Sequence, residues 1–382
     1  MGEQGNTISQ TVCDMENLLH KKEVISYIDD LIQKGVIQKS LEKNVKLPIL
    51  KPTGKLDTIW IEITSRCNLK CVHCYADADS PQIGEELSKK TIFSVIDDAA
   101  EMNCRKIQFT GGEPTMRADL IELIEYAKSR VDIVEIFTNG TLLNEDQIKF
   151  FAENEVHVAF SIYSYRPDTH DSITQVKSSF DKMLGNLKLL LAYNVRVFGA
   201  AVAMKQNEKE LDDTIQFLSK LGVLTRLPDP IRPTGRGINQ RFWPKDYSLL
   251  LLRSEPDFVV NKQVYEKNLF WNSCWMGKVT VTSAGDVLPC NFGREQVVGN
   301  VHDERLKDLI NNEKMKYFWE LTMDKIEVCK DCEYRYICPD CRPWAFGFTG
   351  KLTAKSPRCT YDPYTGEWAP PENSELYTNT QT

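Results

Sequence analysis

Residues 56–230 alternate between short apolar stretches and longer amphipathic ones, and this alternation constrains the fold more than any other feature. Stretches rich in β-branched and aromatic residues predict strands at 58–64, 105–110, 132–138, 156–162, 195–203 and 223–228. Helical spacing of apolar residues predicts helices at 90–102, 118–129, 145–154, 180–193 and 208–221. Such repeats imply a parallel sheet with helices outside it. We therefore expect an α/β fold with six strand–helix steps, either open or closed into a barrel.

The composition restricts the broad class of protein. The 382 residues carry a net charge of −7 and are 42% hydrophobic and 26% charged, which is ordinary for a globular protein. Without a long basic run we expect no nucleic-acid partner, although acidic or peptide substrates remain open. No apolar run approaches the roughly 18 residues of a membrane span. The polar start MGEQGNTISQ is unlike a secretory signal, so we expect a cytoplasmic protein.

The 12 cysteines gather toward the two ends of the chain, and only 5 histidines accompany them. In a cytosolic protein, clustered cysteines are more often metal ligands or reactive thiols than disulfides. The tightest group is Cys67-x3-Cys71-x2-Cys74, directly after the first predicted strand. A structural zinc ion needs a fourth ligand, for which His73 is a candidate. Three cysteines suit a 4Fe–4S cluster better, because they leave one iron open for a substrate or cofactor.

The next strands also end in polar or glycine-rich loops. The second ends in Gly111-Gly112-Glu113, the third leads into Asn139, and the fourth leads into Ser161. Because the active site of a parallel α/β barrel forms at the carboxyl ends of its strands, these residues and the cysteine loop converge on one rim. The glycines let backbone approach a ligand closely, and the carboxylate of Glu113 suits an ammonium group. Alone, this glycine motif would be an ordinary strand-to-helix turn.

The sequence CNLKCVHCY followed by FTGGEP resembles the radical S-adenosylmethionine (radical SAM) superfamily over about residues 56–230. The resemblance implies a partial (β/α)6 TIM-like barrel. It also implies reductive cleavage of SAM to a 5′-deoxyadenosyl radical, with a 4Fe–4S cluster on Cys67, Cys71 and Cys74. The remaining roles that it implies are Tyr75 beside the adenine, Gly111, Gly112 and Glu113 at the methionine ammonium, and Asn139 and Ser161 near the ribose or substrate.

Seven further cysteines fill the last third of the chain. A zinc ribbon predicts CxxC pairs and four or eight ligands, which seven cysteines with an x5 spacer fit poorly. The pattern resembles the SPASM extension of radical SAM enzymes, a small cysteine-rich domain with two auxiliary 4Fe–4S clusters. By that resemblance, Cys329, Cys332, Cys338 and Cys359 hold an outer cluster, and Cys274, Cys290 and Cys341 hold an inner one.

Two departures from the SPASM pattern concern the inner cluster. Only two residues separate Cys338 from Cys341, where the family commonly has three, and the stretch KNLFWNSC before Cys274 has no additional cysteine. The inner cluster then has three thiolate ligands. Its open iron either binds a substrate thiolate or is closed by a side chain such as Asp or Asn.

The expected organisation has five parts. Residues 1–55 form a helical extension with an amphipathic stretch at 22–34, which either packs on the main domain or is the remnant of a leader-peptide-binding module. Residues 56–230 form the radical SAM core, 231–270 a bridge, 271–365 the SPASM domain and 366–382 a polar tail. The bridge contains PTGRG at 233–237, where Arg236 either binds a carboxylate or is structural. Cys13 and Cys104 are expected to be ordinary thiols.

SPASM enzymes mostly modify ribosomally made peptides, so the resemblance implies a peptide maturase, and the open inner iron favours formation of a cysteine thioether. The expected partners are a precursor peptide and a flavodoxin- or ferredoxin-type reductant. The alternatives are a tetrapyrrole-modifying or sulfatase-maturing SPASM enzyme. A non-catalytic peptide-binding or electron-transfer protein is a further alternative, against which the intact cysteine and glycine motifs argue.

Overall fold

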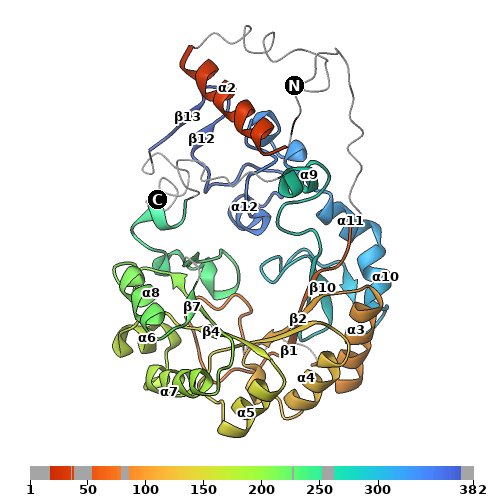
Figure 1. Ribbon diagram of the computed structural model, residues 1–382, viewed down its shortest axis with the longest axis vertical. Coiled ribbons are helices and arrows are strands. Elements are labelled where there is room, and N and C mark those ends of the chain that lie inside the picture. Colours follow the sequence, from red (N-terminus) through yellow and green to blue (C-terminus); the bar gives the residue numbers. More distant parts are fainter. Residues whose placement is uncertain are drawn as a thin grey trace.

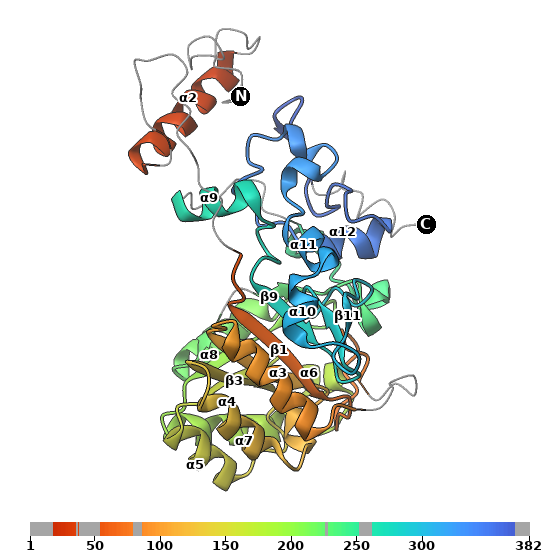
Figure 2. The same cartoon turned by 90° about the vertical axis from the view of Figure 1, so that its right-hand side faces the viewer.

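The computed structural model describes residues 18–35, 37, 54–78, 86–225, 228–251 and 262–370, so Cys13 lies outside the described residues. Figure 1 shows a body built around one sheet, with a smaller irregular body above it and helix α2 at the top. The side view in Figure 2 shows the same division, with β9 and α10 at the junction. The division follows the sequence, because the regular strand–helix region precedes the cysteine-rich one.

The main sheet has nine strands in the order β11-β10-β9-β1-β2-β3-β4-β5-β7. The six strands β1, β2, β3, β4, β5 and β7 run parallel to one another, as the strand–helix alternation predicts, and the sheet does not close into a barrel. These strands are built from apolar residues such as the buried Ile59, Ile61 and Ile63 of β1. Their bounds are β1 Thr58–Thr64, β2 Lys106–Gly111, β3 Ile133–Thr138, β4 His157–Ser161, β5 Val197–Ala200 and β7 Leu224–Thr225.

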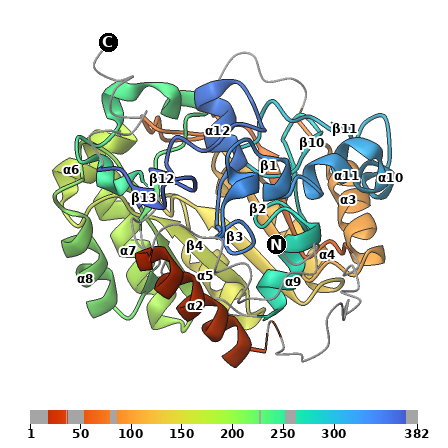
Figure 3. The ribbon, with the colours of Figure 1, turned by 90° about the horizontal axis from the view of Figure 1, so that it is seen from above.

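Helices cover the outer side of this sheet (Figures 1 and 3). In α3, the predicted apolar face of Ile92, Val95, Ile96 and Ala99 is buried, which is the packing that drives an amphipathic helix onto a sheet. The helix begins at Ser88, whose side chain accepts a hydrogen bond from the amide of Thr91. The helices are α3 Lys89–Glu101, α4 Leu120–Lys128, α5 Glu145–Glu153, α6 Pro167–Thr174, α7 Ser179–Ala192 and α8 Leu211–Lys220.

Two elements differ from the sequence-based expectation. The strand expected at 195–203 is divided into β5 and β6 (Val202–Ala203), because β6 leaves the main sheet and pairs with β8 (Asp229–Pro230). Helix α6 was not expected, since its eight residues, PDTHDSIT, are mostly polar and give no clear apolar period. Its first residue is Pro167, a favourable position for proline in a helix.

The cysteine-rich region contributes strands to the core sheet. Strand β9 (Lys278–Val281) pairs with β1 in parallel, from Thr58 opposite Lys278 to Ile61 opposite Val281. Strands β10 (Asp286–Leu288) and β11 (Gly299–Asn300) continue the sheet in antiparallel fashion. The rest of the region is short helices and a small hairpin: α9 Lys262–Phe270, α10 Leu306–Asn311, α11 Glu313–Trp319, α12 Arg342–Thr349, β12 Tyr361–Asp362 and β13 Glu367–Trp368.

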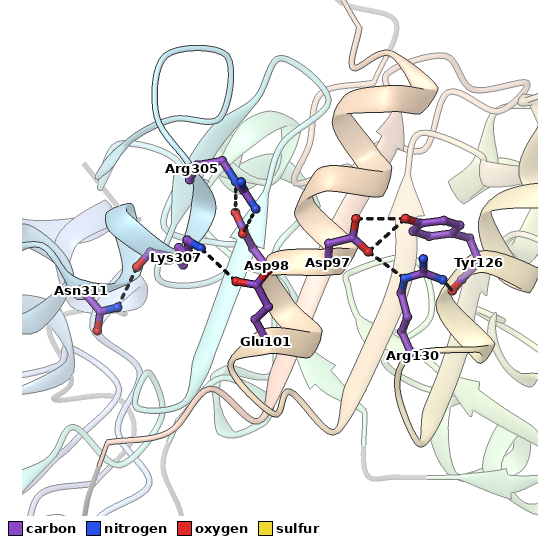
Figure 4. Close-up of polar contacts among 8 residues, drawn as sticks. All are labelled: Asp97, Asp98, Glu101, Tyr126, Arg130, Arg305, Lys307 and Asn311. Carbon is purple, nitrogen blue, oxygen red and sulfur yellow. Dashed lines mark hydrogen bonds and ion pairs between the residues drawn. The ribbon is translucent and has the colours of Figure 1, made fainter.

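Ion pairs join α3 of the core to the segment that begins α10. Arg305 contacts the buried carboxylate of Asp98 through two nitrogens, one of them at 3.0 Å, and Lys307 lies 2.9 Å from Glu101 (Figure 4). On the opposite side of α3, Asp97 contacts Arg130, which lies just after the end of α4, at 2.7 Å. Helix α3 therefore forms ion pairs both with the segment that follows α4 and with the cysteine-rich region.

Helix α2 (Leu18–Gln33) lies against the cysteine-rich region, where Tyr27 makes an edge contact with Tyr334 and Leu31 packs with Ile337. Within the described ranges, no helix is long and apolar enough to cross a membrane.

Candidate functional site: a cysteine loop facing two cysteine sets

The loop that carries Cys67, Cys71 and Cys74 leaves the end of β1 and is anchored on α6. The amides of Lys70 and Val72 each donate at 3.0 Å to carbonyl oxygens at the end of that helix. Burial raises the pKa of the Cys71 thiol, and the neighbouring thiols of Cys74 and Cys67 raise it further. A bound cation favours thiolates and offsets this cost, so the donor set fits a metal centre.

The glycines at the end of β2 bring their backbone against the start of this loop. Gly111 has φ +137°, and a Cβ there would lie 2.2 Å from the carbonyl oxygen of Thr64; a Cβ at Gly112 would lie 2.1 Å from that of Arg66. The amides of Gly112 and Glu113 donate to these same two oxygens at 2.8 Å. Because Gly111 and Gly112 have no side chains, the backbone of the glycine motif can approach and hydrogen-bond to the backbone at the start of the cysteine loop.

Glu113 is fully buried at the rim. One carboxylate oxygen accepts bonds from the amide of Thr115 at 3.1 Å and from the hydroxyls of Thr115 and Thr138 at 2.6 Å. The other accepts one bond among the described residues, from the amide of Asn139 at 2.8 Å. Burial raises the pKa of Glu113, and these donors oppose that rise. A buried carboxylate with spare acceptor capacity on one oxygen suits a cation such as an ammonium group.

Asn139 connects the third strand to the cysteine loop. Its side-chain nitrogen donates to Asn68 at 2.9 Å and lies 4.0 Å from the sulfur of Cys67, while its side-chain oxygen accepts from the amide and hydroxyl of Thr141. Its backbone amide reaches Glu113, so three of the predicted site regions converge at one residue.

Ser161 ends β4 and is buried, and its side chain forms a hydrogen bond with that of Tyr163. Tyr163 packs edge-on against His73 with 4.7 Å between ring centres and stacks on His170 at 5.4 Å. Burial lowers the pKa of His73 to about 3 and that of His170 to about 4. Both imidazoles are therefore neutral near pH 7, and they contribute ring packing to the site and no charge.

Tyr75, directly after the last loop cysteine, faces the cysteine-rich region. Its half-buried ring makes an edge contact with Phe292 at 5.2 Å, and the guanidinium carbons of Arg232 and Arg294 lie 4.8 Å from Phe292 and 5.8 Å from Tyr75. Arg294 is held by the buried Glu62 through two bonds of 2.7 and 3.1 Å. The rings of Tyr75 and Phe292 and the two guanidinium groups therefore lie where the cysteine loop meets the second cysteine region.

A polar pocket of about 180 Å³ lies where β1 and β2 end beside the β9–β10 hairpin. Its lining includes Ser65, Gly111 and Gly112 from the core, and Asp286 and Arg294 from the cysteine-rich region. Both regions of the chain therefore contribute to one pocket at the rim.

The PTGRG motif, at residues 233–237, forms hydrogen bonds with the backbone of the cysteine loop. The amide of Arg236 donates to the carbonyl oxygen of Cys74 at 2.9 Å, and its guanidinium donates to that of Cys71 at 2.9 Å and to Asp77 at 3.0 Å. A Cβ on Gly235, which has φ +54°, would lie 2.5 Å from the carbonyl oxygen of Cys74. In this structure Arg236 therefore supports the loop backbone.

The same motif also contacts the cysteine-rich region. A Cβ on Gly347 of α12 would lie 2.6 Å from the carbonyl oxygen of Pro233. Burial raises the pKa of Cys341, which begins α12, and the positive charge of Arg232 opposes that rise. Residues 232–237 thus contact both the cysteine loop and α12, and place a positive charge near Cys341 of the second region.

Cys274, Cys290 and Cys341 come from three separate elements: the turn after α9, the end of β10 and the start of α12. Burial raises the pKa of Cys290 to about 12, and the nearby thiols of Cys274 and Cys341 contribute to the rise. The fold therefore makes neighbours of three cysteines that are distant in sequence.

Cys329, Cys332, Cys338 and Cys359 form the other group. Burial is the main cause of the raised pKa of Cys338, and Cys359, Cys329 and Cys332 all add to it. None of the cysteines of the described residues forms a disulfide. Among these residues, no three His, Cys, Asp or Glu side chains lie close enough to hold a single metal ion. A four-iron cluster is wider than one ion, so its ligands stand farther apart.

Two family models match the chain: the radical SAM superfamily over residues 61–218, and SPASM, an iron–sulfur cluster-binding domain, over residues 274–333. The chain therefore belongs to the radical SAM superfamily and carries a SPASM domain, as the two cysteine patterns predict. These domains imply SAM and 4Fe–4S clusters as its cofactors.

Similar proteins differ in what they modify. An AdoMet-dependent heme synthase of Methanosarcina barkeri is 25% identical, over 79% of this chain and 95% of that protein. The antilisterial bacteriocin subtilosin biosynthesis protein AlbA of Bacillus subtilis is 26% identical, over 86% of this chain and 74% of that protein. The structure of native anSMEcpe with bound AdoMet has a TM-score of 0.61 at 21% identity, over 78% of this chain and 92% of that one, and this likeness shows the fold.

Several residues of the site were missed by sequence reasoning. Asn68, Thr138, Phe292 and Arg294 approach the predicted residues only through the fold. Thr138 carried a signal, because it lies directly before Asn139 at the end of a predicted strand. The other three have no local pattern that distinguishes them.

Proposed function

We propose that this radical SAM/SPASM enzyme modifies a ribosomally made precursor peptide and forms a thioether between a cysteine sulfur and a carbon of that peptide. The observation that carries the proposal is the group of Cys274, Cys290 and Cys341, whose three thiols leave one iron of a four-iron cluster without a cysteine ligand. The similarity to AlbA, a bacteriocin biosynthesis protein, supports a peptide substrate.

The proposed roles of the rim residues follow from their burial and contacts. Cys67, Cys71 and Cys74 would hold the SAM-binding cluster, and Glu113 would receive the methionine ammonium on its less occupied oxygen, with Gly111 and Gly112 beside it. Tyr75 would lie beside the adenine. Asn139 and Ser161 would lie near the ribose or the substrate.

Two auxiliary clusters are proposed for the second region, the outer on Cys329, Cys332, Cys338 and Cys359 and the inner on Cys274, Cys290 and Cys341. When bound, SAM and the clusters supply a carbon-centred radical that removes a hydrogen atom from the peptide, and an acceptor for the remaining electron. Thioether formation removes two hydrogen atoms from the peptide, one from the thiol and one from carbon. The chain itself would position the peptide. The packed rings of Tyr75 and Phe292 would exclude water from the site.

Reduction by a flavodoxin- or ferredoxin-type protein stays a prediction, as do a cytoplasmic location and the five-part division of the chain. A pocket of about 350 Å³, lined by Pro233, Ile238, Gln240, Trp243, Gly347 and Phe348, is a place where a peptide side chain would fit. Ile238 is 63% exposed at its edge.

The test is co-expression with a cysteine-bearing precursor peptide encoded nearby, followed by mass spectrometry. We expect the loss of two hydrogen atoms per bridge and protection of one cysteine from alkylation. Cys74→Ala should abolish this change, whereas Cys104→Ala, outside all three groups, should leave it intact. Unmodified peptide together with SAM cleavage by the same preparation would refute peptide modification while leaving the enzyme class standing.

A tetrapyrrole substrate is the second candidate, because the similarity to the heme synthase extends over 95% of that protein. Incubating the reduced enzyme and SAM with a propionate-bearing porphyrin tests it. Loss of carbon dioxide from the porphyrin, with no change in the peptide, would favour this candidate.

A further inference from the structure

The two auxiliary groups contain seven thiols, whereas two four-iron clusters bound entirely by protein require eight ligands. The group with four thiols is the outer one, so the eighth ligand position belongs to the inner group. A ligand there must be a side chain that is already buried beside these cysteines and has an atom to spare.

Asp340 has this property. Its side chain is 4% exposed, and its Oδ1 atom has no hydrogen-bond partner among the described residues. Its Oδ2 atom is held by the buried guanidinium of Arg342 through two contacts. A buried carboxylate oxygen without a partner is costly, because it has lost water and gained nothing. The arrangement therefore indicates that Oδ1 has a partner in the working protein.

Arg342 keeps the carboxylate in place. Its Nη1 atom donates to the carbonyl oxygens of Leu352 and Ala354, at 2.7 Å each. With the guanidinium fixed by backbone and by Oδ2, the direction of Oδ1 is fixed as well. This is the preorganisation expected of a metal ligand that is supported by its neighbours.

Asp340 lies at the boundary between the two groups. It directly precedes Cys341 of the inner group and follows Cys338 of the outer group by two residues. Its negative charge contributes to the raised pKa of both thiols and of Cys329. A single carboxylate therefore acts on both groups, while only the inner one lacks a ligand.

The other buried and unpartnered side-chain atoms of the described residues do not compete. Those of Trp275, Trp344 and Arg232 are N–H groups, which donate hydrogen bonds and do not bind iron. His73 lies within the first cysteine loop, and the oxygen of Gln206 belongs to a neutral amide that follows β6. Asp340 carries the only anionic oxygen in this set.

We propose that Oδ1 of Asp340 is the fourth ligand of the inner cluster, and that a substrate thiolate can replace it. The inference rests on the proposed cluster groups. A carboxylate is a harder ligand than a thiolate, so soft iron–sulfur sites bind it less tightly. When Oδ1 is displaced, the carboxylate stays paired with Arg342, so no isolated buried charge is created. The exchange transfers no electrons: one anionic ligand leaves as another binds.

The test uses the full chain with Cys67, Cys71 and Cys74 replaced by Ala, so that only auxiliary clusters remain. Asp340→Ala and Asp340→Cys are compared with Asp324→Ala, a matched change at a carboxylate that is half-exposed and paired with Arg335. After reconstitution, about eight iron atoms per chain are counted, and the reduced protein is titrated with β-mercaptoethanol by electron paramagnetic resonance. Asp340→Asn replaces Asp340→Ala if the alanine variant precipitates.

We expect the Asp324→Ala protein to match its parent. Asp340→Ala should bind the thiol at a concentration at least tenfold lower, and Asp340→Cys should show a changed spectrum and no response to the thiol. Identical spectra and identical thiol responses in all of these proteins would overturn the ligand assignment. A Cys341→Ala variant that retains both auxiliary clusters would instead refute the proposed cluster groups.

Discussion

Replacing Arg236 by Gln should selectively weaken the first cysteine loop. The substitution removes guanidinium bonds to the carbonyl oxygens of Cys71 at 2.9 Å and Ala78 at 3.1 Å, and the ion pair with Asp77. Hydrogen bonds from a charged donor contribute about 1.5–3 kcal/mol each. Because 31% of the Arg236 side chain is exposed, the lower value applies. The exposed ion pair adds little, so the loop loses about 3 kcal/mol, or roughly a hundredfold in its ordered population.

The assay is the iron content after reconstitution at limiting iron, together with the change that SAM causes in the electron paramagnetic resonance spectrum of the reduced protein. Arg236→Gln should lose both the iron of this loop and the response to SAM, and Arg236→Lys should restore part of them. The control is Arg232→Gln on the same segment, whose side chain contacts Asp229 and lies near Cys341. An Arg236→Gln protein with normal iron and a normal SAM response would refute the reasoning.

Three further outcomes are expected. Gly112→Ala places a Cβ 2.1 Å from a backbone oxygen and should prevent cluster assembly on the first loop, which iron analysis would measure. The control Gly185→Ala lies in open space on helix α7 and should raise the unfolding free energy by roughly 0.5–1 kcal/mol. Burial lowers the pKa of His170 to about 4, so between pH 6.5 and 4 mainly the unfolded chain gains this proton. His170 should therefore contribute a fall of about 1.4 kcal/mol in the unfolding free energy between pH 7.5 and 5.5, and His170→Gln should remove this contribution in urea titrations. Arg305→Ala should lower the midpoint of thermal unfolding more than Lys307→Ala. The first substitution leaves the buried Asp98 without its partner, whereas the second affects only the exposed Glu101. Equal shifts of the two midpoints would contradict this.

Local patterns in the sequence predicted the regular part of the fold. The apolar face of α3 and the parallel order of β1 to β5 follow from residue spacing, which depends only on the geometry of helices and strands. The pairing of β9 with β1 was not predicted, because KVTV is a strand of only four residues whose partner lies far away in the sequence. The division of β5 from β6 was missed for the same reason, since β8 decides it.

The site shows the same limit. The approach of Gly111 and Gly112 to other backbone was expected, but their partners are Thr64 at the end of β1 and Arg66 just before Cys67, which no spacing rule identifies. Arg236 was open between two interpretations, and only tertiary contacts assign it to the loop backbone. The ion pair that leaves one oxygen of Asp340 free likewise depends on the distant carbonyls that hold Arg342.

The pairing of β9 with β1 has a consequence for folding during synthesis. Strand β1 is made early, but the neighbour that covers its free edge is more than half the chain away. Until β9 emerges from the ribosome, the apolar strand TIWIEIT presents unpaired backbone groups, which can pair with another chain. A shortened protein that ends before residue 278 should therefore aggregate, although it contains every strand and helix of the radical SAM core.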